Sequence, residues 1–339
     1  MECGDSRERE SGCDMITFFT TAKPFRGHAG TIQRNALKSW TLLHPDVEVI
    51  LFGDEEGAAG AARELGIRHE PHVERSEYGT KRLDYLFTTA RALARHEVLC
   101  YVNCDIILMD DFCRALEQLR AAHARFLMVG RRWDAEIWEP YYFTRANWQA
   151  RLKAIIRQRG RQRTPEWIDY FAFSRDLYGS TIPPLVVGRV HWDHGLVWRA
   201  LACKEPVVDV SPCVTAAHQN HDYSYHPQGK HGVWNDEESR RNLQLAGGYR
   251  HLRTIDCAQL RLTANGLARN RLHWFAFARR RTMQLAEKSA TTSVAFLQNY
   301  FWHPLLNLTR PIRHRAGLRQ ESMRPAFVRD RSRHFRLDE

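Results

Sequence analysis

Two polar side chains interrupt an otherwise apolar stretch of the chain, residues 98–108. Asn103 and Asp105 stand two residues apart, so both point to one face of the buried strand that this stretch predicts. A buried carboxylate is costly unless a metal ion or a cationic partner compensates its charge. At the carboxyl end of a parallel strand it faces the crevice where open α/β sheets bind ligands. We therefore expect a functional role for Asp105, the alternative being a structural cap for the helix that starts near Asp110.

The segment Asn103-Cys104-Asp105 resembles the Asp-x-Asp motif of GT-A glycosyltransferases, enzymes that use nucleotide sugars, although Asn103 stands where the first Asp usually does. In that family the last Asp binds a divalent metal ion that holds the diphosphate of the donor. The resemblance therefore implies donor binding by Asn103 and Asp105, and metal binding by Asp105. It covers residues 15–250 and includes the order of the other parts: an aromatic strand, Trp-Asp at a helix start and a late His-rich loop.

The resemblance also implies that a histidine from the late loop completes the metal site. His218 ends a predicted strand and is expected as the second metal ligand, whereas His221 is expected to contact the acceptor or a phosphate. For either histidine, the alternative is a hydrogen bond to a neighbouring carbonyl. The implied cofactor is Mn²⁺ or Mg²⁺, because these hard cations favour carboxylate and water ligands and Mn²⁺ also accepts imidazole.

Three further side chains are implied as donor contacts by their places in the same order. Thr20 lies among the hydroxyl residues that end the first strand. Asp54 follows the second strand and is expected to contact the base or ribose, unless it caps the helix that runs to Leu65. Arg82 lies in the first turn of the helix before the Asp105 strand, where a cation would reach a phosphate or the sugar. The alternative for Arg82 is an ordinary exposed charge.

The pair Trp192-Asp193 opens a predicted helix and resembles the acidic position beneath the acceptor in GT-A enzymes. An inverting transfer needs a general base within hydrogen-bond reach of the acceptor hydroxyl. Asp193 is expected in that role, with Trp192 as an apolar face for a sugar ring. The alternative is that Asp193 only caps the helix. Asp169 is a second candidate in the acceptor region, and the sequence leaves inverting and retaining stereochemistry open.

The elements expected around these residues alternate between strands and helices. Strands are expected at 15–21, 47–52, 67–73, 98–108, 125–130, 168–174, 207–210 and 214–217. Helices are expected at 31–43, in a stretch that ends at 65, and at 80–95, 111–122, 141–163 and 195–203. This alternation predicts an α/β fold with a mostly parallel central sheet flanked by helices, which the resemblance makes GT-A-like.

The chain divides by composition into a disordered leader at residues 1–14, a catalytic domain at 15–265 and a basic aromatic helical tail at 266–339. Residues 267–339 hold fifteen Arg and Lys against five Asp and Glu, so nearly all of the formal net charge of +11 lies there. No transmembrane span and no signal peptide are visible, which predicts a cytoplasmic protein. Aromatic and basic helices of this kind also fit peripheral docking on an anionic membrane at its inner face.

These features lead to one principal hypothesis, a metal-dependent glycosyltransferase that moves a sugar from a nucleotide-diphosphate donor to an acceptor hydroxyl. The implied partners are a nucleotide-sugar donor and a glycan or lipid-linked acceptor. The alternative is a non-catalytic GT-A-like scaffold, recruited by its tail to a membrane or to nucleic acid. Nucleic acid ranks last because the chain holds no recognisable nucleic-acid-binding module. The donor sugar, the acceptor and the linkage are not specified by the sequence.

Overall fold

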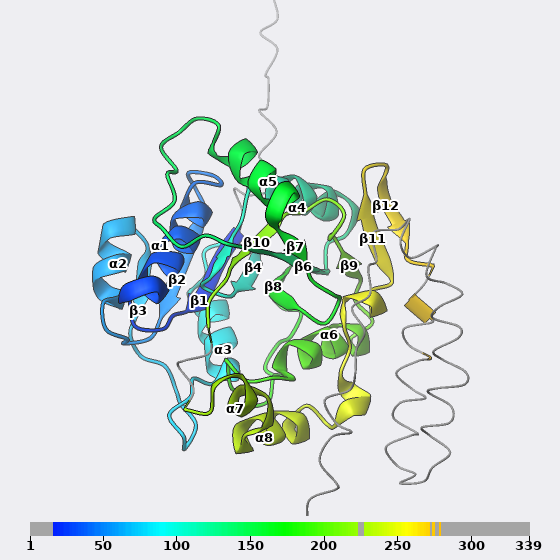
Figure 1. The fold of residues 1–339 in the computed structure, drawn as a ribbon. Helices are drawn as coiled ribbons and strands as arrows, with labels where there is room; N and C mark the ends of the chain where they lie inside the picture. Colours follow the sequence, from blue (N-terminus) through cyan, green and yellow to red (C-terminus); the bar gives the residue numbers. More distant parts are fainter. Residues whose placement is uncertain (1–15, 223–226, 272, 275–277, 279–339) are drawn as a thin grey trace, which may run out of the picture. The chain divides into compact units, whose positions relative to one another are not determined.

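A computed structural model describes residues 16–222, 227–271, 273, 274 and 278, all within one compact unit of residues 1–287 (Figure 1). The leader expected at residues 1–14 lies outside the described residues. So does the predicted tail at 266–339, apart from residues 266–271, 273, 274 and 278. The strands are β1 (Ile16–Thr21), β2 (Glu48–Phe52), β3 (Arg68–Glu70), β4 (Val98–Val102), β5 (Ile106–Ile107), β6 (Leu127–Ala135), β7 (Arg161–Gln162), β8 (Ile168–Ser174), β9 (Val207–Asp209), β10 (Ala216–Gln219), β11 (Leu260–Thr263) and β12 (Gly266–Arg269). The α-helices are α1 (Gly27–Thr41), α2 (Ala58–Leu65), α3 (Leu83–Leu93), α4 (Asp110–Ala122), α5 (Trp148–Arg159), α6 (Trp192–Ala202), α7 (Gly229–Asn235) and α8 (Glu237–Leu245).

The strands form one sheet in the order β12-β11-β9-β6-β8-β4-β1-β2-β3. Along this path every strand runs in the same direction except β8 and β12, because β8 pairs antiparallel with both β4 and β6 and β12 pairs antiparallel with β11. Off the path, β10 pairs with β5 and β6, and β7 pairs with β6. The predicted α/β fold with a mostly parallel sheet flanked by helices is confirmed.

The two faces of the sheet bury separate cores because successive side chains of a strand alternate between faces. Phe18 packs in one core with side chains of α1, α2 and α4, and its ring lies 5.8 Å from that of Trp40. Phe19 packs in the other core with side chains of α3 and α6, and its ring lies 5.0 Å from that of Phe87. The alternation continues along β4, where Cys100 belongs to the first core and Tyr101 to the second. Both faces of β4 are thus covered, as its apolar run predicts.

Three expected elements differ from the structure in ways that shape the site. The strand expected at 98–108 is divided into β4 and β5, and Asn103 and Asp105 lie in the segment between them instead of on one face of a strand. The helix expected at 141–163 is confined to α5, because residues 161–162 form β7 against the edge of β6. The strand expected at 125–130 instead runs on to Ala135, because its second half pairs with β7 and β10 after its first half pairs with β8 and β9. Charged residues that were expected beyond the strand, Arg131, Arg132 and Asp134, therefore lie within it.

The sheet continues past the expected domain boundary at residue 265, because β12 begins at Gly266 and pairs with β11. The division of the chain at that point remains a prediction. Within the described residues, no helix has the length and apolar character needed to cross a bilayer.

Gly130 provides a test of packing inside the sheet. A Cβ atom at this position would collide with the hydroxyl of Tyr170, and that buried hydroxyl has no hydrogen-bond partner among the described residues. We expect Gly130→Ala to lower the free energy of unfolding by about 1–3 kcal/mol, the usual cost of overpacking. Thermal denaturation would measure the loss, and adding Tyr170→Phe should recover part of it. Gly60→Ala, at an open position in α2, is the control and should be neutral or stabilising. An unchanged melting temperature in Gly130→Ala would contradict the packing described.

Candidate functional site

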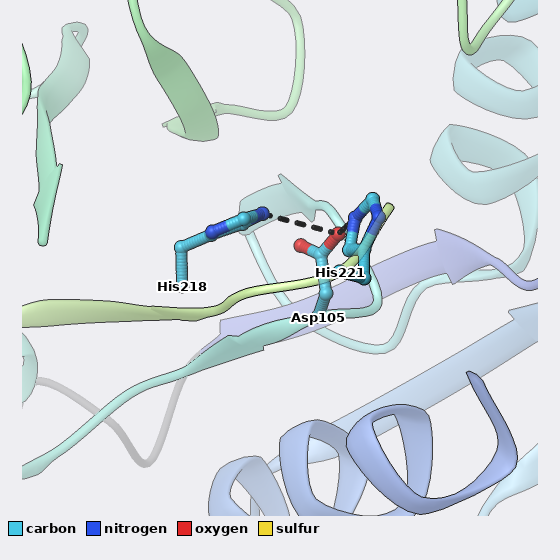
Figure 2. Close-up of side chains that lie close together, drawn as sticks. All are labelled: Asp105, His218 and His221. Carbon is cyan, nitrogen blue, oxygen red and sulfur yellow. Dashed lines mark hydrogen bonds and ion pairs between the residues drawn. The ribbon is translucent and has the colours of Figure 1, made fainter. Parts of the chain in front are cut away.

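One carboxylate and two histidines converge just past the carboxyl end of β4 (Figure 2). Nε2 of His221 lies 3.0 Å from Oδ2 of Asp105, and Nε2 of His218 lies 3.7 Å from the same oxygen. One ligand atom from each of the three residues can be chosen so that all lie within 4.8 Å of one another. This spacing suits three ligands of a single metal ion.

Strand pairing brings these distant residues together. In β10, His218 is paired with Ile106 of β5, the residue that follows Asp105. The next residue, Gln219, is fully buried and fastens the Asp105 backbone, since its backbone N–H and its side-chain amide both donate to the Asp105 carbonyl, at 3.1 and 3.2 Å. Ala217 precedes His218 in β10, and its side chain belongs to a third apolar cluster with residues of α5. This packing holds β10 in place next to the two histidines.

The electrostatics of Asp105 fit a cation at this point. Burial would raise the pKa of Asp105, but His218, His221 and Lys23 together hold it well below its usual range, so the group is a carboxylate at neutral pH. Its second oxygen, Oδ1, is buried and has no hydrogen-bond partner among the described residues. An orphaned carboxylate oxygen beside two imidazoles provides the mixed oxygen and nitrogen donor set that suits Mn²⁺.

The structure places His221 nearer to Asp105 than His218, whereas the sequence suggested His218 as the ligand and His221 as an acceptor or phosphate contact. The orientation of the His221 ring accounts for this, because its Nδ1 atom lies 2.6 Å from the backbone carbonyl oxygen of Asp222 while its Nε2 atom faces Asp105. Both histidines thus direct Nε2 toward the same carboxylate oxygen.

Asn103 and Asp169 lie beside this group and bind one another. The Asn103 side-chain amide donates to Oδ1 of Asp169 at 2.7 Å, and its backbone N–H donates to the Asp169 carbonyl at 2.9 Å. Arg132 also donates to both carboxylate oxygens of Asp169, at 3.2 and 3.1 Å. Asp169 is therefore a compensated, buried carboxylate that ties β8 to the loop after β4 and to β6.

Asp193 has the environment of a base. Asp193 lies in the first turn of α6. The N-cap of this helix is His191, so Asp193 does not hold the capping position that was its alternative role. Oδ1 of Asp193 is buried without a hydrogen-bond partner among the described residues. Burial raises the pKa of Asp193, and this effect outweighs the opposing influence of the neighbouring His194. A carboxylate with a raised pKa is a stronger base near neutral pH.

Trp192 does not offer the open face that was expected for a sugar ring. Its side chain is 5% exposed, and its ring centroid lies 5.3 Å from that of Tyr101 and 5.5 Å from that of Phe171. The residue belongs to the core on the α3 and α6 side of the sheet. Trp192 lies on the buried face of α6. The pair Trp192-Asp193 alone does not show which face of the helix is buried.

The three expected donor contacts have structural partners of their own. Thr20 is fully buried, and its hydroxyl donates to the Val102 carbonyl at 2.6 Å, so this side chain joins β1 to β4. Asp54 is exposed and pairs with Arg75 at 2.6 Å. Arg82 lies at the N-cap position of α3 and forms ion pairs with Glu74 and Asp84, each at 2.6 Å. Their roles toward a donor remain predictions.

Lys81 and Asp134 are two charged residues of this region that the sequence analysis did not assign. Lys81 is buried, donates to the Ala22 carbonyl at 2.6 Å and pairs with Glu55 at 2.5 Å, so it links the ends of β1 and β2. Asp134 lies 3.3 Å from Nδ1 of His218. The sequence signal for Lys81 was a cation at the start of the helix expected at 80–95, and that for Asp134 was a charge after the strand expected at 125–130. Many surface residues share such positions.

Comparison with known proteins gave matches among solved structures. No family model and no curated protein sequence matches the chain. S. aureus TarS 1-349 matches with a TM-score of 0.41 and 9% identity over 60% of this chain and 60% of that one. Glucosyl-3-phosphoglycerate synthase from Mycobacterium tuberculosis, in complex with Mn²⁺, UDP and glucosyl-3-phosphoglycerate, matches with a TM-score of 0.42 and 14% identity over 69% of this chain and 80% of that one.

Proposed function

We propose that this chain is a metal-dependent glycosyltransferase that transfers a sugar from a nucleotide-diphosphate donor to an acceptor hydroxyl. One observation carries the proposal: a carboxylate at the carboxyl end of a central parallel strand, Asp105, meets two histidines, and one of its oxygens is buried and unsatisfied. Ligands bind at this edge of open α/β sheets. A site of one carboxylate and two imidazoles suits a divalent ion that holds a diphosphate.

The residues take distinct roles in this proposal. Asp105, His218 and His221 would hold Mn²⁺ or Mg²⁺, which neutralises the negative charge that develops on the departing diphosphate. Asn103 and Asp169 fasten the loop after β4 to β8 and so keep Asp105 in place. Asp193 accepts the proton of the acceptor hydroxyl, because its carboxylate has a raised pKa and a free buried oxygen. This assignment corresponds to an inverting transfer.

A thermal-shift panel tests the proposal directly. UDP, GDP, CMP and dTDP would each be added with and without Mn²⁺, with Mn²⁺ alone as the reference. A ligand at about 100 times its Kd stabilises the native state by about 2.7 kcal/mol, and for a chain of this size each kcal/mol raises the melting temperature by about 2–4 °C. We expect a rise of about 5–10 °C with one nucleotide diphosphate, only when Mn²⁺ is present. Equal shifts with and without Mn²⁺, or none at all, would favour a non-catalytic scaffold.

The same proposal includes the acceptor and the cellular location of the reaction. The acceptor is a glycan or a lipid-linked acceptor, and the reaction takes place in the cytoplasm. Docking of the basic tail on an anionic membrane concerns residues outside the described part of the chain, and remains a prediction from composition.

A further inference from the structure

His218 lies between two carboxylates. Its Nε2 atom lies 3.7 Å from Oδ2 of Asp105, and its Nδ1 atom lies 3.3 Å from Oδ1 of Asp134. The pairing of β10 with its neighbours creates this arrangement, because the register sets His218 opposite Asp134 of β6 on one side and opposite Ile106 of β5 on the other. The ring therefore spans the gap between the metal centre and β6.

Asp134 is itself firmly held. Arg132 donates through Nε to Oδ1 of Asp134 at 2.9 Å, and Nε of Arg163 lies 3.2 Å from Oδ2. Both guanidinium groups lie over the ring of Trp167, at 4.6 and 4.4 Å from its centroid, which restricts their movement. Asp134 is thus paired with two arginines, which hold its carboxylate in place beside His218.

The two histidines of the proposed metal centre have their ring nitrogens placed in the same way. Nδ1 of His221 lies 2.6 Å from a backbone carbonyl oxygen, and Nδ1 of His218 lies 3.3 Å from a carboxylate oxygen, while Nε2 of each ring is directed at Asp105. In a neutral imidazole, an acceptor beside Nδ1 keeps the proton there and leaves the Nε2 lone pair for a metal. A carboxylate in that position also makes the imidazole a better ligand.

His218 Nδ1 is buried, has no hydrogen bond among the described residues, and has the Asp134 carboxylate 3.3 Å away. We infer that Asp134 is a positioning residue of the metal centre: when a divalent ion binds Nε2, Asp134 accepts the Nδ1 proton of His218, fixes the ring and its tautomer, and so raises the affinity for the ion. The inference rests on the proposed function, because it takes Asp105, His218 and His221 as the metal ligands. It adds a residue that does not contact the metal and that links the centre to β6 and, through Arg132, to Asp169.

The test is the affinity of the full chain for Mn²⁺ alone, measured by isothermal titration calorimetry. Loss of an outer carboxylate partner of a metal-binding histidine typically weakens metal binding 10- to 100-fold. We expect Asp134→Asn to raise the Kd for Mn²⁺ by about that factor, because a neutral amide accepts the Nδ1 proton weakly and can turn its NH₂ toward the ring. Asp209→Asn is the matched control, since Asp209 is a buried strand carboxylate paired with an arginine, Arg261. Its Kd should stay within about twofold of the wild type.

A second measurement on the wild-type chain guards against an Asp134 variant that does not fold. In ¹⁵N-histidine-labelled protein loaded with Zn²⁺, a diamagnetic substitute for Mn²⁺, long-range ¹H–¹⁵N spectra should place the proton of His218 on Nδ1 and the metal on Nε2. His218→Gln identifies the signal. An unchanged Mn²⁺ affinity in a folded Asp134→Asn variant, a metal on Nδ1 of His218, or a wild-type chain without Mn²⁺ binding would each overturn the inference. Mn²⁺ binding that depends on Asp134 without any nucleotide binding would support the inference and refute the proposed transferase activity.

Discussion

Replacing Asp105 with alanine is expected to abolish the metal-dependent stabilisation by a nucleotide diphosphate while the chain still folds. Asp105 supplies the only carboxylate of the three-residue cluster, so its loss leaves two imidazoles, which hold a hard cation such as Mg²⁺ or Mn²⁺ poorly. The rise of about 5–10 °C expected for the wild-type chain should fall to zero in thermal-shift measurements with saturating Mn²⁺ and nucleotide. Circular dichroism would show that the secondary structure is kept.

The ligand-free Asp105→Ala variant should be slightly less stable than the wild type. Nε2 of His221 lies at hydrogen-bond distance, 3.0 Å, from Oδ2 of Asp105, and the pKa of Asp105 is held low by its neighbours, so its carboxylate is not an uncompensated charge. Losing such a hydrogen bond costs about 1–3 kcal/mol.

Asp110→Ala is the control for this experiment, because Asp110 is a half-exposed carboxylate at the start of α4 that pairs with Arg114 and Lys153. It should keep the full metal-dependent shift. Nucleotide binding with an undiminished Mn²⁺ requirement in Asp105→Ala would remove the Asp105 centre from the proposed function.

The fold was predictable from the sequence where local pattern and burial agree. Residues 98–108 read as a strand covered on both faces, and the first part of this stretch is β4, which lies between β1 and β8 with apolar cores on both sides. The alternation of strands and helices before Asp105 likewise specified parallel neighbours. Asp105 itself was detectable because a carboxylate in an apolar run needs a partner.

The partners of Asp105 were only partly predictable, because strand pairing over long separations decides them. The strand expected at 125–130 stopped short of residues 131–134, since a strand buried on both faces is expected to be apolar. They continue β6 because Arg132, Asp134 and Asp169 satisfy one another's charges inside the protein. Asp134 meets His218 only through the β6–β10 pairing, across more than eighty residues of chain. No local pattern encodes that register.

Asp193→Asn separates catalysis from structure. The substitution preserves the shape of the side chain and removes its basicity, and α6 does not rely on it for an N-cap, because His191 occupies that position. If Asp193 accepts the acceptor proton, turnover should fall by a factor of about 10²–10⁴, with little change in nucleotide affinity. The wild-type rate should also fall as the pH is lowered through the pKa of Asp193, which burial places above the ordinary carboxyl value.

Stability distinguishes this outcome from a folding defect. A carboxyl whose pKa is raised in the folded state makes the native protein less stable above that pKa, and the penalty disappears as the pH falls below the ordinary value. Asp193→Asn removes the penalty, so at neutral pH the variant should melt at the same temperature as the wild type or higher. A slower reaction in an equally stable protein, measured as turnover of the donor identified by the nucleotide panel, assigns the base. Full turnover in Asp193→Asn would direct attention to a retaining transfer or to Asp169. The carboxylate of Asp169 is less available to an acceptor hydroxyl, because Asn103 and Arg132 already donate to it.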